Sequence, residues 1–394
     1  MGFRFSNIPR SLRIEHVPNP RSGSAAAFLW GPRQTGKSTY LEQHYPAAKR
    51  YDLLDTELAA SLAVRPRLLR EEVLAARPAL VVVDEVQKIP ALLEEVHWLL
   101  EHTATRFILC GSSARKLRRG AANLLGGRAT EFQLFPLVSA ELPELDLDRL
   151  LVHGGLPSHY LTDDPRPLLR SYVDTYIKQE IIDESATRNI PAFSRFLQTV
   201  GLTHGRQLNY ANVARECGVA AHTVRAYYQI LEDTLLGFTL EPWRRKGKRR
   251  LVETAKFYVF DMGVANQLNP DARVVASGTD LYGRAFELFV LNEVRAWRAY
   301  GGRDEPLSFW RTSSGFEVDL VVGDMQLAVE AKSTRDVRHD DLRGLRALRE
   351  EQTVGRAIVV HRGDVARRTE DGIEILPWRE FCARLWSGEL LPRA

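Results

Sequence analysis

Two stretches of the chain carry residue types and spacings that suit phosphate chemistry. The first, AAAFLWGPRQTGKST, places glycines, a lysine and hydroxyls after an apolar run within residues 25–39. The second, FEVDLVVGDMQLAVEAKST, sets Asp319, Glu330 and Lys332 among apolar residues. A glycine-rich loop with a lysine and a hydroxyl binds nucleotide phosphates and Mg²⁺. Two carboxylates and a lysine could hold a divalent metal for phosphodiester cleavage, or could form an ordinary solvated face.

The first stretch is a full Walker A match, with a strand expected before it and a helix after it. Lys37 is expected to reach the outer phosphates, and the Ser38 hydroxyl to ligate Mg²⁺ at the helix N-terminus. These flanking elements argue against a chance loop. The expected ATP-binding residues are Gly31, Pro32, Arg33, Gln34, Thr35, Gly36, Lys37, Ser38 and Thr39.

Further apolar runs end in residues that could complete an ATP site. Residues 79–83 are apolar and precede Asp84 and Glu85, which suits a central strand of a parallel sheet. Asp84 would hold Mg²⁺ through water, and Glu85 would polarise the attacking water. Another apolar run, over 106–110, leads to Ser112, which is either a sensor that helps to position that water or a helix N-cap. The pattern predicts an α/β fold with a P-loop core.

Taken together, GPRQTGKST, VVVDEVQKIP, ILCGSSARKL, GGR and GGLPSHYL resemble the fourteenth group of bacterial and archaeal AAA-type ATPases, near the STAND-like clade. The resemblance extends to the segments around Asp319 and Glu330, and so spans nearly the whole chain. It implies that Ser112 is the sensor, that Arg128 is an arginine finger, and that Pro157 packs against adenine. It also implies ATP and Mg²⁺ as cofactors and a homo-oligomeric ring such as a hexamer.

Residues 208–231 show the pattern of a helix-turn-helix. Ala214 is the small residue of the first helix, Gly218 falls in the turn, and Val224 is an apolar anchor of the second helix. The alternative is a module that serves only for packing. The residues that the second helix would present to DNA are His222, Thr223, Arg225 and Tyr228.

A basic run follows, in which six of the residues 244–250 are Arg or Lys and Gly247 is a natural hairpin tip. A basic hairpin after a helix-turn-helix is the wing of a winged helix, which touches phosphates. Six like charges repel one another unless an anion compensates, so DNA is preferred over a merely solvated surface. The expected contacts to the DNA backbone, including branched or single-stranded forms, are Arg244, Arg245, Lys246, Lys248, Arg249 and Arg250.

The order of acids near the C-terminal end resembles the PD-(D/E)XK nuclease fold. A helix carries Glu287 at the edge of its apolar stripe, where a carboxylate needs a partner. The resemblance implies that Asp319 and Glu330 bind Mg²⁺ or Mn²⁺, that Lys332 positions water, and that Glu287 completes the metal shell. Glu293 is the rival for the helical acid.

The geometry of this expected site depends on a hairpin register. A two-residue turn at 323–324 would pair Asp319 with Ala328 and set Glu330 diagonally beside Asp319. Lys332 would then lie on the same face, because side chains alternate along a strand.

The length, net charge and cysteine content of the chain limit which functions can be expected. A chain of 394 residues is long enough for two or three domains, and its net charge of +4 does not by itself indicate a nucleic-acid partner. Three cysteines without metal-ligand spacing, and no apolar run of about 20 residues, predict a cytoplasmic protein without a membrane partner. The predicted domains are a P-loop AAA core (1–140), a helical lid (141–202), a winged helix (203–268) and a restriction-endonuclease-like α/β domain (269–394).

The function expected from the sequence is that of an ATP-dependent motor or remodeller acting on DNA. Two alternatives stay open. One is a STAND-like switch, in which ATP holds an assembled state and the partner is a protein. The other is a DNA-binding ATPase whose nuclease fold is inert.

Overall fold

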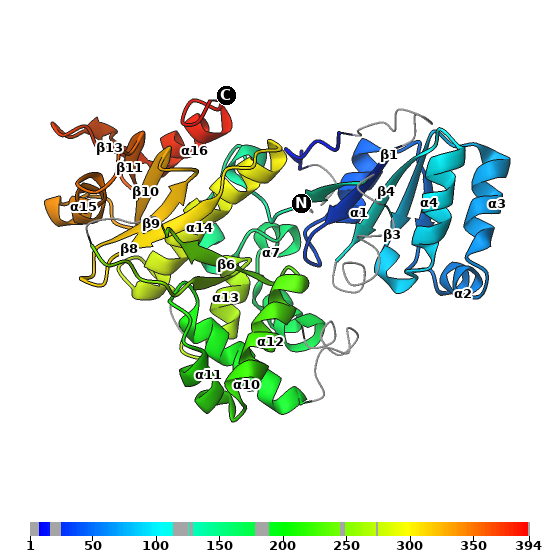
Figure 1. Ribbon diagram of the computed structural model, residues 1–394, viewed down its shortest axis with the longest axis horizontal. Helices are drawn as coiled ribbons and strands as arrows, with labels where there is room; N and C mark the ends of the chain where they lie inside the picture. Colours follow the sequence, from blue (N-terminus) through cyan, green and yellow to red (C-terminus); the bar gives the residue numbers. More distant parts are fainter. Residues whose placement is uncertain are drawn as a thin grey trace. The chain divides into compact units, whose positions relative to one another are not determined.

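The structure is a computed structural model that describes residues 8–15, 25–112, 125, 129–177, 189–244, 249–272 and 275–392. The chain divides into two compact units (Figure 1). The first unit comprises Met1–Phe135 with Asp233–Leu235, and the second comprises Pro136–Glu232 with Leu236–Ala394.

The first unit contains a parallel sheet in the order β2-β3-β4-β1-β5. Its strands are β1 (Ala25–Trp30), β2 (Lys49–Asp52), β3 (Leu80–Asp84), β4 (Arg106–Gly111) and β5 (Ala129–Gln133). Its helices are α1 (Lys37–His44), α2 (Thr56–Val64), α3 (Arg67–Ala76) and α4 (Leu92–His102), and a 3-10 turn spans Val86–Lys88. All six residues of β1 are buried, as expected for a strand with both faces covered.

The strand order brings the ends of the predicted ATP motifs to one edge of this sheet. Strand β4 lies between β3 and β1, and all three run parallel. The loop after β1, Asp84 at the end of β3 and Ser112 after β4 therefore meet at the carboxyl edge, where open α/β sheets bind ligands. The α/β prediction for this part of the chain is confirmed.

The second unit begins with helices that pack around one apolar core. They include α6 (Leu147–His153), α7 (Pro157–Leu161), α8 (Arg166–Ser171), a π-helical turn (Tyr172–Ile177), α10 (Ile190–Thr203), α11 (Tyr210–Cys217), α12 (Ala221–Asp233) and α13 (Met262–Leu268). The core joins Phe196 of α10, Cys217 of α11 and Val224 of α12. None of the helices in the described ranges is long and apolar enough to cross a membrane.

A mixed sheet forms the rest of the second unit, in the order β12-β13-β11-β10-β9-β8-β6-β7. Its strands are β6 (Gly237–Pro242), β7 (Lys256–Val259), β8 (Leu307–Arg311), β9 (Glu317–Val322), β10 (Leu327–Lys332), β11 (Arg356–His361), β12 (Arg367–Arg368) and β13 (Glu374–Pro377). The helices that follow α13 are α14 (Asp280–Tyr300), α15 (Arg343–Arg349) and α16 (Trp378–Trp386), and a 3-10 turn spans His339–Leu342.

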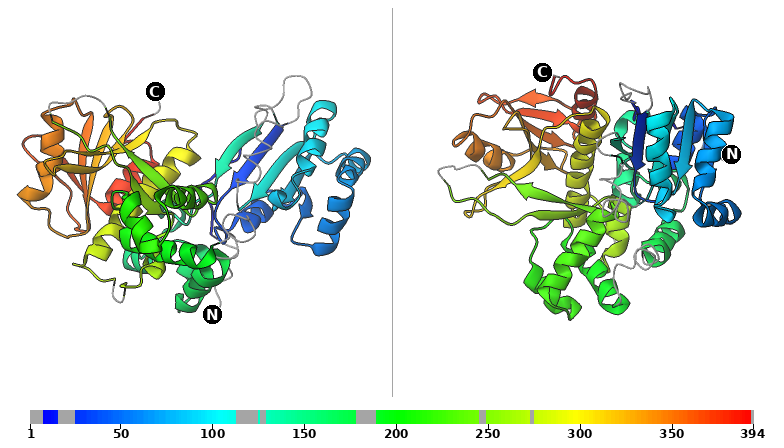
Figure 2. Two further views of the ribbon diagram at one scale, coloured as in Figure 1. Left: turned by 60° about the horizontal axis from the view of Figure 1, so that its bottom comes forward. Right: turned by 45° about the vertical axis from the view of Figure 1, so that its right-hand side comes forward.

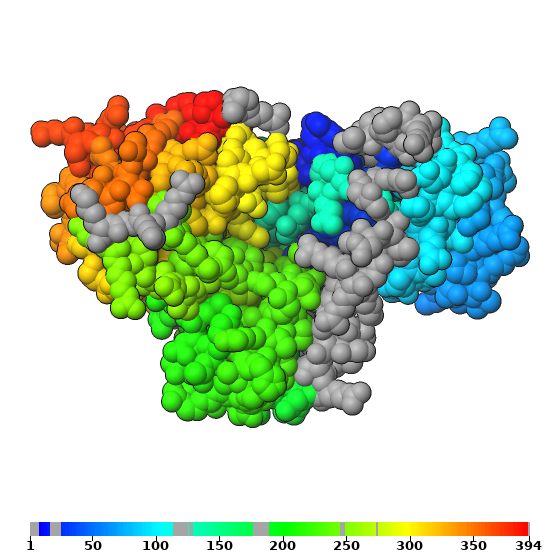
Figure 3. Space-filling model, viewed as in Figure 1, coloured from blue at the N-terminus to red at the C-terminus, as the bar shows by residue number. Residues whose placement is uncertain are grey.

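Strand β6 links the helix-turn-helix segment to the C-terminal sheet. Its first part pairs antiparallel with β7, from Gly237 opposite Val259 to Leu240 opposite Lys256. Its last residues pair instead with β8, in parallel. The rotated views in Figure 2 show the green strands beside the yellow and orange strands of this sheet. Figure 3 shows the green and orange parts of the second unit on one face of the molecule. The sheet therefore runs across the boundary that the sequence places at residue 268.

Candidate functional site

The glycines of the first motif hold the loop between β1 and α1 in its shape. Gly36 has φ 87°, a left-handed conformation that favours glycine, and it precedes the first residue of α1. A Cβ atom on Gly31 would lie 2.7 Å from the carbonyl oxygen of Leu134. The loop therefore needs glycine at both positions.

Lys37 and Thr35 lie inside this loop. The Lys37 Nζ donates to the carbonyl oxygens of Gly31 (2.8 Å) and Pro32 (3.1 Å), and the side chain is only 6% exposed. The Thr35 hydroxyl is buried and donates to the Pro32 carbonyl at 2.9 Å. The ammonium group is thus held within the loop, and its contact with phosphates stays a prediction.

The predicted Mg²⁺ ligands of the ATP site lie in contact. The Ser38 Oγ donates to the Asp84 Oδ2 at 2.6 Å, although 46 residues separate them in the chain. A hydroxyl and a carboxylate are oxygen donors of the kind that Mg²⁺ prefers. The two residues fit a Mg²⁺ ion that bridges to nucleotide phosphates.

Glu85 and Ser112 face each other beside that pair. The Ser112 Oγ lies 3.4 Å from Glu85 Oε2, and Gln87 donates both to this carboxylate and to Ser112 (3.1 Å). The contact places Ser112 beside the carboxylate that is expected to polarise water, and the sensor role of Ser112 stays a prediction. The N-cap interpretation concerns residues after 112 that lie outside the described ranges. Glu85 itself has φ 57°, a conformation uncommon for a residue with a side chain.

Two residues of this region were missed by sequence reasoning. Gln87 lies in the 3-10 turn after β3, where its amide orients the Glu85 carboxylate. Arg10 is buried and donates to the carbonyl oxygens of Thr35 (2.7 Å) and Phe135 (2.5 Å). No local pattern marks Arg10, because its partners are 25 and 125 residues away.

Two further residues, Arg128 and Pro157, were predicted to belong to the ATP site. Arg128 lies outside the described residues. Pro157 is the first residue of α7, in the second unit, and its contact with adenine stays a prediction.

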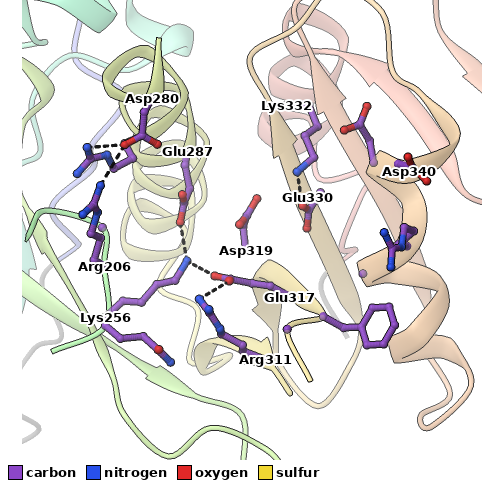
Figure 4. Close-up of a pocket in the computed structure, with 18 of the residues that line it drawn as sticks. Arg206, Lys256, Asp280, Glu287, Arg311, Glu317, Asp319, Glu330, Lys332 and Asp340 are labelled. Atoms are coloured by element: carbon purple, nitrogen blue, oxygen red, sulfur yellow. Dashed lines mark hydrogen bonds and ion pairs between the residues drawn. The ribbon is translucent and has the colours of Figure 1, made fainter. Parts of the chain in front are cut away.

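The acids and the lysine of the second stretch line a cavity of about 820 Å³ in the second unit (Figure 4). Its walls come from α14, the strands β7, β8, β9 and β10, the start of α15 and the segment before α11. Glu287, Asp319 and Glu330 face a common space, with Lys332 beside Glu330. The structure therefore brings together all four residues that were predicted to share a site.

The predicted register of the β9–β10 hairpin is wrong. Leu327 pairs with Val322 and Ala328 pairs with Val321, so four residues, 323–326, form the turn. Met325 takes φ 63° there, which its residue type does not reveal. The register differs from the predicted one by two residues, and an even shift keeps every side chain on its face. For this reason the acids still share one side of the sheet.

Asp319 and Glu330 are crowded and only partly neutralised. Asp319 Oδ2 accepts from the Ala331 N–H at 2.8 Å, and Glu330 Oε1 accepts from Lys332 Nζ at 2.6 Å. Glu330 is only 6% exposed, and its buried Oε2 has no hydrogen-bond partner in the described part of the chain. Burial, together with the neighbouring Glu330 and Glu287, raises the pKa of Asp319 well above its usual range. Burial also raises the pKa of Glu330, although Lys332 opposes this.

The partner that Glu287 needed is Lys256, from β7. Lys256 Nζ lies 2.9 Å from Glu287 Oε1 and 2.6 Å from Glu317 Oε1. The Tyr258 hydroxyl donates to the same Glu287 oxygen. Burial alone would lower the pKa of Lys256, but the negative groups around it, Glu287 above all, raise the pKa well above its usual range. Sequence reasoning missed Lys256, although it is one of only nine lysines in the chain.

The rival acid, Glu293, is used elsewhere in the second unit. It is 1% exposed and accepts from the Ser139 N–H (2.7 Å) and from Trp386 Nε1 (2.7 Å). Glu293 therefore secures the C-terminal helix and does not line the cavity.

The cavity can be tested for its fit to a divalent metal. Within the described ranges no three His, Cys, Asp or Glu side chains converge closely enough to hold a metal ion by themselves. Mg²⁺ in phosphate-transfer sites commonly takes one or two carboxylates and completes its shell with water and phosphate oxygens. Asp319 and the unpartnered oxygen of Glu330 suit that kind of site.

The helix-turn-helix has the predicted elements, joined by Gly218 at φ 67°. Val224 is fully buried, while Arg225 is exposed and stacks over the Tyr210 ring at 5.1 Å. His222 is exposed and Thr223 is half-buried, and their contact with DNA stays a prediction. Tyr228 was wrongly expected on that surface. It is 4% exposed and packs in the helical core.

The basic run is only partly described, since residues 245–248 lie outside the described ranges. Arg244 pairs with Glu241 at 2.6 Å, and Arg250 is exposed. Arg249 pairs with Glu350 (2.5 Å) and Glu351 (3.1 Å) of the segment after α15. Acids of the chain itself thus offset part of the repulsion that was attributed to a missing anion.

Three family models match successive parts of the chain. Residues 24–142 match an AAA domain, residues 144–273 match a domain of unknown function (DUF8612), and residues 282–381 match another (DUF4143). An uncharacterised protein of Mycobacterium tuberculosis is 28% identical over 302 residues, which cover 75% of this chain and 67% of that protein. An uncharacterised protein of Haemophilus influenzae is 23% identical over 289 residues, which cover 65% of this chain and 72% of that protein.

Solved structures give weaker likenesses. The Aeropyrum pernix ORC1 protein in complex with DNA is 13% identical with a TM-score of 0.27, covering 63% of this chain and 87% of that one. A STAND protein with a tetratricopeptide repeat sensor from Pyrococcus horikoshii is 14% identical with a TM-score of 0.23, covering 76% and 50%. TM-scores this low carry no argument about fold or function.

The AAA match covers the residues whose geometry is described above for the first unit: the glycine-rich loop, the Ser38–Asp84 contact and the Glu85–Ser112 contact. Residues 24–142 of this chain therefore form a domain of the AAA-type ATPase family.

Proposed function

We propose that the chain hydrolyses ATP in its first unit and uses that reaction to act on DNA held by its second unit. The AAA domain supports the first half of this proposal. The single observation that carries the second half is the cavity in which the buried, unpartnered Oε2 of Glu330 lies beside Asp319.

In the ATP half, each residue has a role that its contacts support. Lys37 would bind the outer phosphates, and Ser38 and Asp84 would hold Mg²⁺. Glu85, oriented by Gln87 and Ser112, would polarise the attacking water. Arg128 would serve the site of a neighbouring subunit in a homo-oligomeric ring, such as a hexamer.

In the DNA half, a bound Mg²⁺ or Mn²⁺ would supply a water of lowered pKa and charge stabilisation for phosphodiester cleavage. Asp319 and Glu330 would hold the ion, and Lys332 would position the water beside Glu330. Glu287 would face the ion across the cavity. Arg206 and Arg311 of the cavity wall are paired with Asp280 and Glu317, so the bound ion would supply the positive charge that a DNA phosphate needs.

DNA would be held through its backbone. Thr223 and Arg225 on α12 and the basic run from Arg244 to Arg250 are the proposed contacts. Such contacts position the protein without reading a base sequence.

The test uses the full chain with labelled single-stranded, duplex and branched DNA, in the presence of Mg²⁺ or Mn²⁺. We expect metal-dependent cleavage, which Asp319→Ala and Lys332→Ala abolish without loss of ATPase activity. Asp280→Asn is the matched control. Asp280 also lines the cavity, but it is already paired with Arg206 (3.2 Å) and Arg284 (2.6 Å).

Two results would contradict the proposal. If Mn²⁺ gives no anomalous scattering at Asp319 and Glu330 and no DNA is cut, the C-terminal sheet is an inert nuclease-like fold. If none of the DNA forms binds or changes the ATPase rate, the action on DNA is lost and a switch with a protein partner takes its place.

A further inference from the structure

Lys256 fills a position between two carboxylates in the proposed metal-dependent site. It is 3% exposed and extends from β7 toward α14 and β9. Its Nζ lies close to one oxygen of Glu287 and one of Glu317, at 2.9 and 2.6 Å. Two carboxylates from separate elements thus converge on one positive charge, which is how acidic residues also hold a metal ion.

The carboxylates around Lys256 are well supplied with partners. Glu287 Oε1 accepts from the Tyr258 hydroxyl in addition to Lys256. Glu317 Oε2 accepts from Arg311 at 2.7 Å. This half of the cavity, which we call the lysine half, therefore holds two carboxylates against two positive groups.

The other half of the cavity, formed by Asp319, Glu330 and Lys332, is different. It holds two carboxylates against one ammonium group, and that ammonium bonds only to Glu330 Oε1 within the described residues. Glu330 Oε2 is buried and without a partner there. We call this the open half, because one buried carboxylate oxygen there has no hydrogen-bond partner among the described residues.

We propose that Lys256 is a built-in cation that takes the place of a second divalent ion between Glu287 and Glu317, so that the cavity accepts one divalent ion, in the open half. The inference rests on the proposed metal-dependent action on DNA. It assigns a role to a residue that lies outside the predicted nuclease motif. A lysine ammonium is a compact positive charge that can sit between two carboxylates.

The test counts Mn²⁺ ions bound by the nucleotide-free full chain, using electron paramagnetic resonance titration. Ions that disappear in Asp319→Asn or in Glu287→Gln are assigned to the cavity. We expect one such ion in the unaltered chain and two in Lys256→Met, which keeps an unbranched side chain, one atom shorter, and removes its charge. The second ion should be lost again in Lys256→Met combined with Glu287→Gln.

Two further variants separate charge from general disturbance. Lys256→Arg keeps the positive charge and should still bind one ion. Lys49→Met removes a lysine that pairs with Glu72 at the same 2.9 Å, but in the first unit, and should leave the number of bound ions unchanged.

The outcomes distinguish this inference from the proposed function. Two cavity ions in the unaltered chain, or one ion in a folded Lys256→Met, would overturn the role of Lys256 alone. No cavity ion in any variant would overturn the metal-dependent function as well. If Lys256→Met fails to fold, Mn²⁺ anomalous scattering from crystals of the unaltered chain decides the matter. One peak at Asp319 and Glu330 supports the inference, and a further peak between Glu287 and Glu317 refutes it.

Discussion

The ATP site of the first unit and the cavity of the second unit are both suited to phosphate chemistry, but they are built differently. In the ATP site, the loop between β1 and α1 supplies backbone groups, and Lys37 is held by carbonyl oxygens. In the cavity, charged side chains face one another, and the pKa of Asp319 is raised by burial and by neighbouring acids.

The difference shows which of the two sites is electrostatically unfavourable before a ligand binds. A backbone loop fixed by glycines is ready for an anion without placing like charges together. A group of buried carboxylates is unfavourable until a cation joins it. The first site should therefore be insensitive to divalent metal in its folding, and the second should depend on it.

The largest expected effect tests whether the ATP site is complete within one chain. Arg128→Ala should lower ATP turnover by roughly 10³-fold or more, because an arginine supplied from a neighbour stabilises transition-state charge. Mixtures of Arg128→Ala with Lys37→Ala chains should recover activity, since each supplies what the other lacks. Mixtures whose activity never exceeds that of the two separate proteins would show that Arg128 does not act in trans.

The next effect tests the chemistry of the ATP site. Glu85→Gln should bind ATP and turn it over about 10²- to 10³-fold more slowly, because the water loses its polarising group. Lys37→Ala should lose nucleotide binding instead. Binding of a fluorescent ATP analogue and steady-state hydrolysis separate the two. Normal turnover in Glu85→Gln would remove the role given to that carboxylate.

The next effect is smaller and concerns the stability of the fold. Only the cavity of the second unit is expected to make this stability depend on pH and on Mn²⁺. A carboxyl with a raised pKa in the folded protein, such as that of Asp319, stabilises the fold most below its unfolded pKa near 3.8. That contribution is lost as the pH rises through the raised value. Mn²⁺ at 100 times its Kd should add about 2.7 kcal/mol of stability. At one fixed Mn²⁺ concentration the gain should be larger at pH 8 than at pH 5, because ionised carboxylates bind the ion more tightly. Urea denaturation without nucleotide measures it.

The control for this experiment is Asp319→Asn, which should show a weaker pH dependence and little gain from Mn²⁺. An equal Mn²⁺ effect in this variant would place the metal elsewhere and erase the contrast between the two sites.

The smallest effect concerns the basic run. Neutralising Arg244, Arg245 and Lys248 should flatten the salt dependence of duplex binding by about 0.9 log units for each DNA phosphate that the protein no longer neutralises. Arg249→Ala should change the salt slope less, because Arg249 already pairs with Glu350 and Glu351. Equal slopes for all variants and the unaltered chain, in a fluorescence-anisotropy titration, would mean that the run does not touch DNA.

The parts of the molecule that were predictable are those whose information is local. Consecutive residues determine the Walker loop, the strand before Asp84 and the turn at Gly218. The structure contains all three. The alternation of side chains along β9 and β10 put Asp319 and Glu330 on one face even though the turn was wrong. An even error in register leaves faces intact.

What could not be predicted depends on distant segments. Lys256 reaches Glu287 across 31 residues and enters from a strand that the sequence assigned to another domain. Arg10 is likewise tied to Phe135. Arg249 has acidic partners about 100 residues away, which a reading of local charges misses. Contacts of this kind follow from tertiary packing and leave no periodic signal.

The passage of β6 from β7 to β8 has a consequence for any attempt to divide the protein. A fragment that starts after residue 268 would lose β6 and β7, leaving the backbone N–H and C=O groups of β8 along an open edge. Open edges of this kind recruit strands from other molecules. Such a fragment would stack edge to edge and precipitate, and it would also lack Lys256. A cut near residue 136, where the second unit begins, would keep the sheet whole.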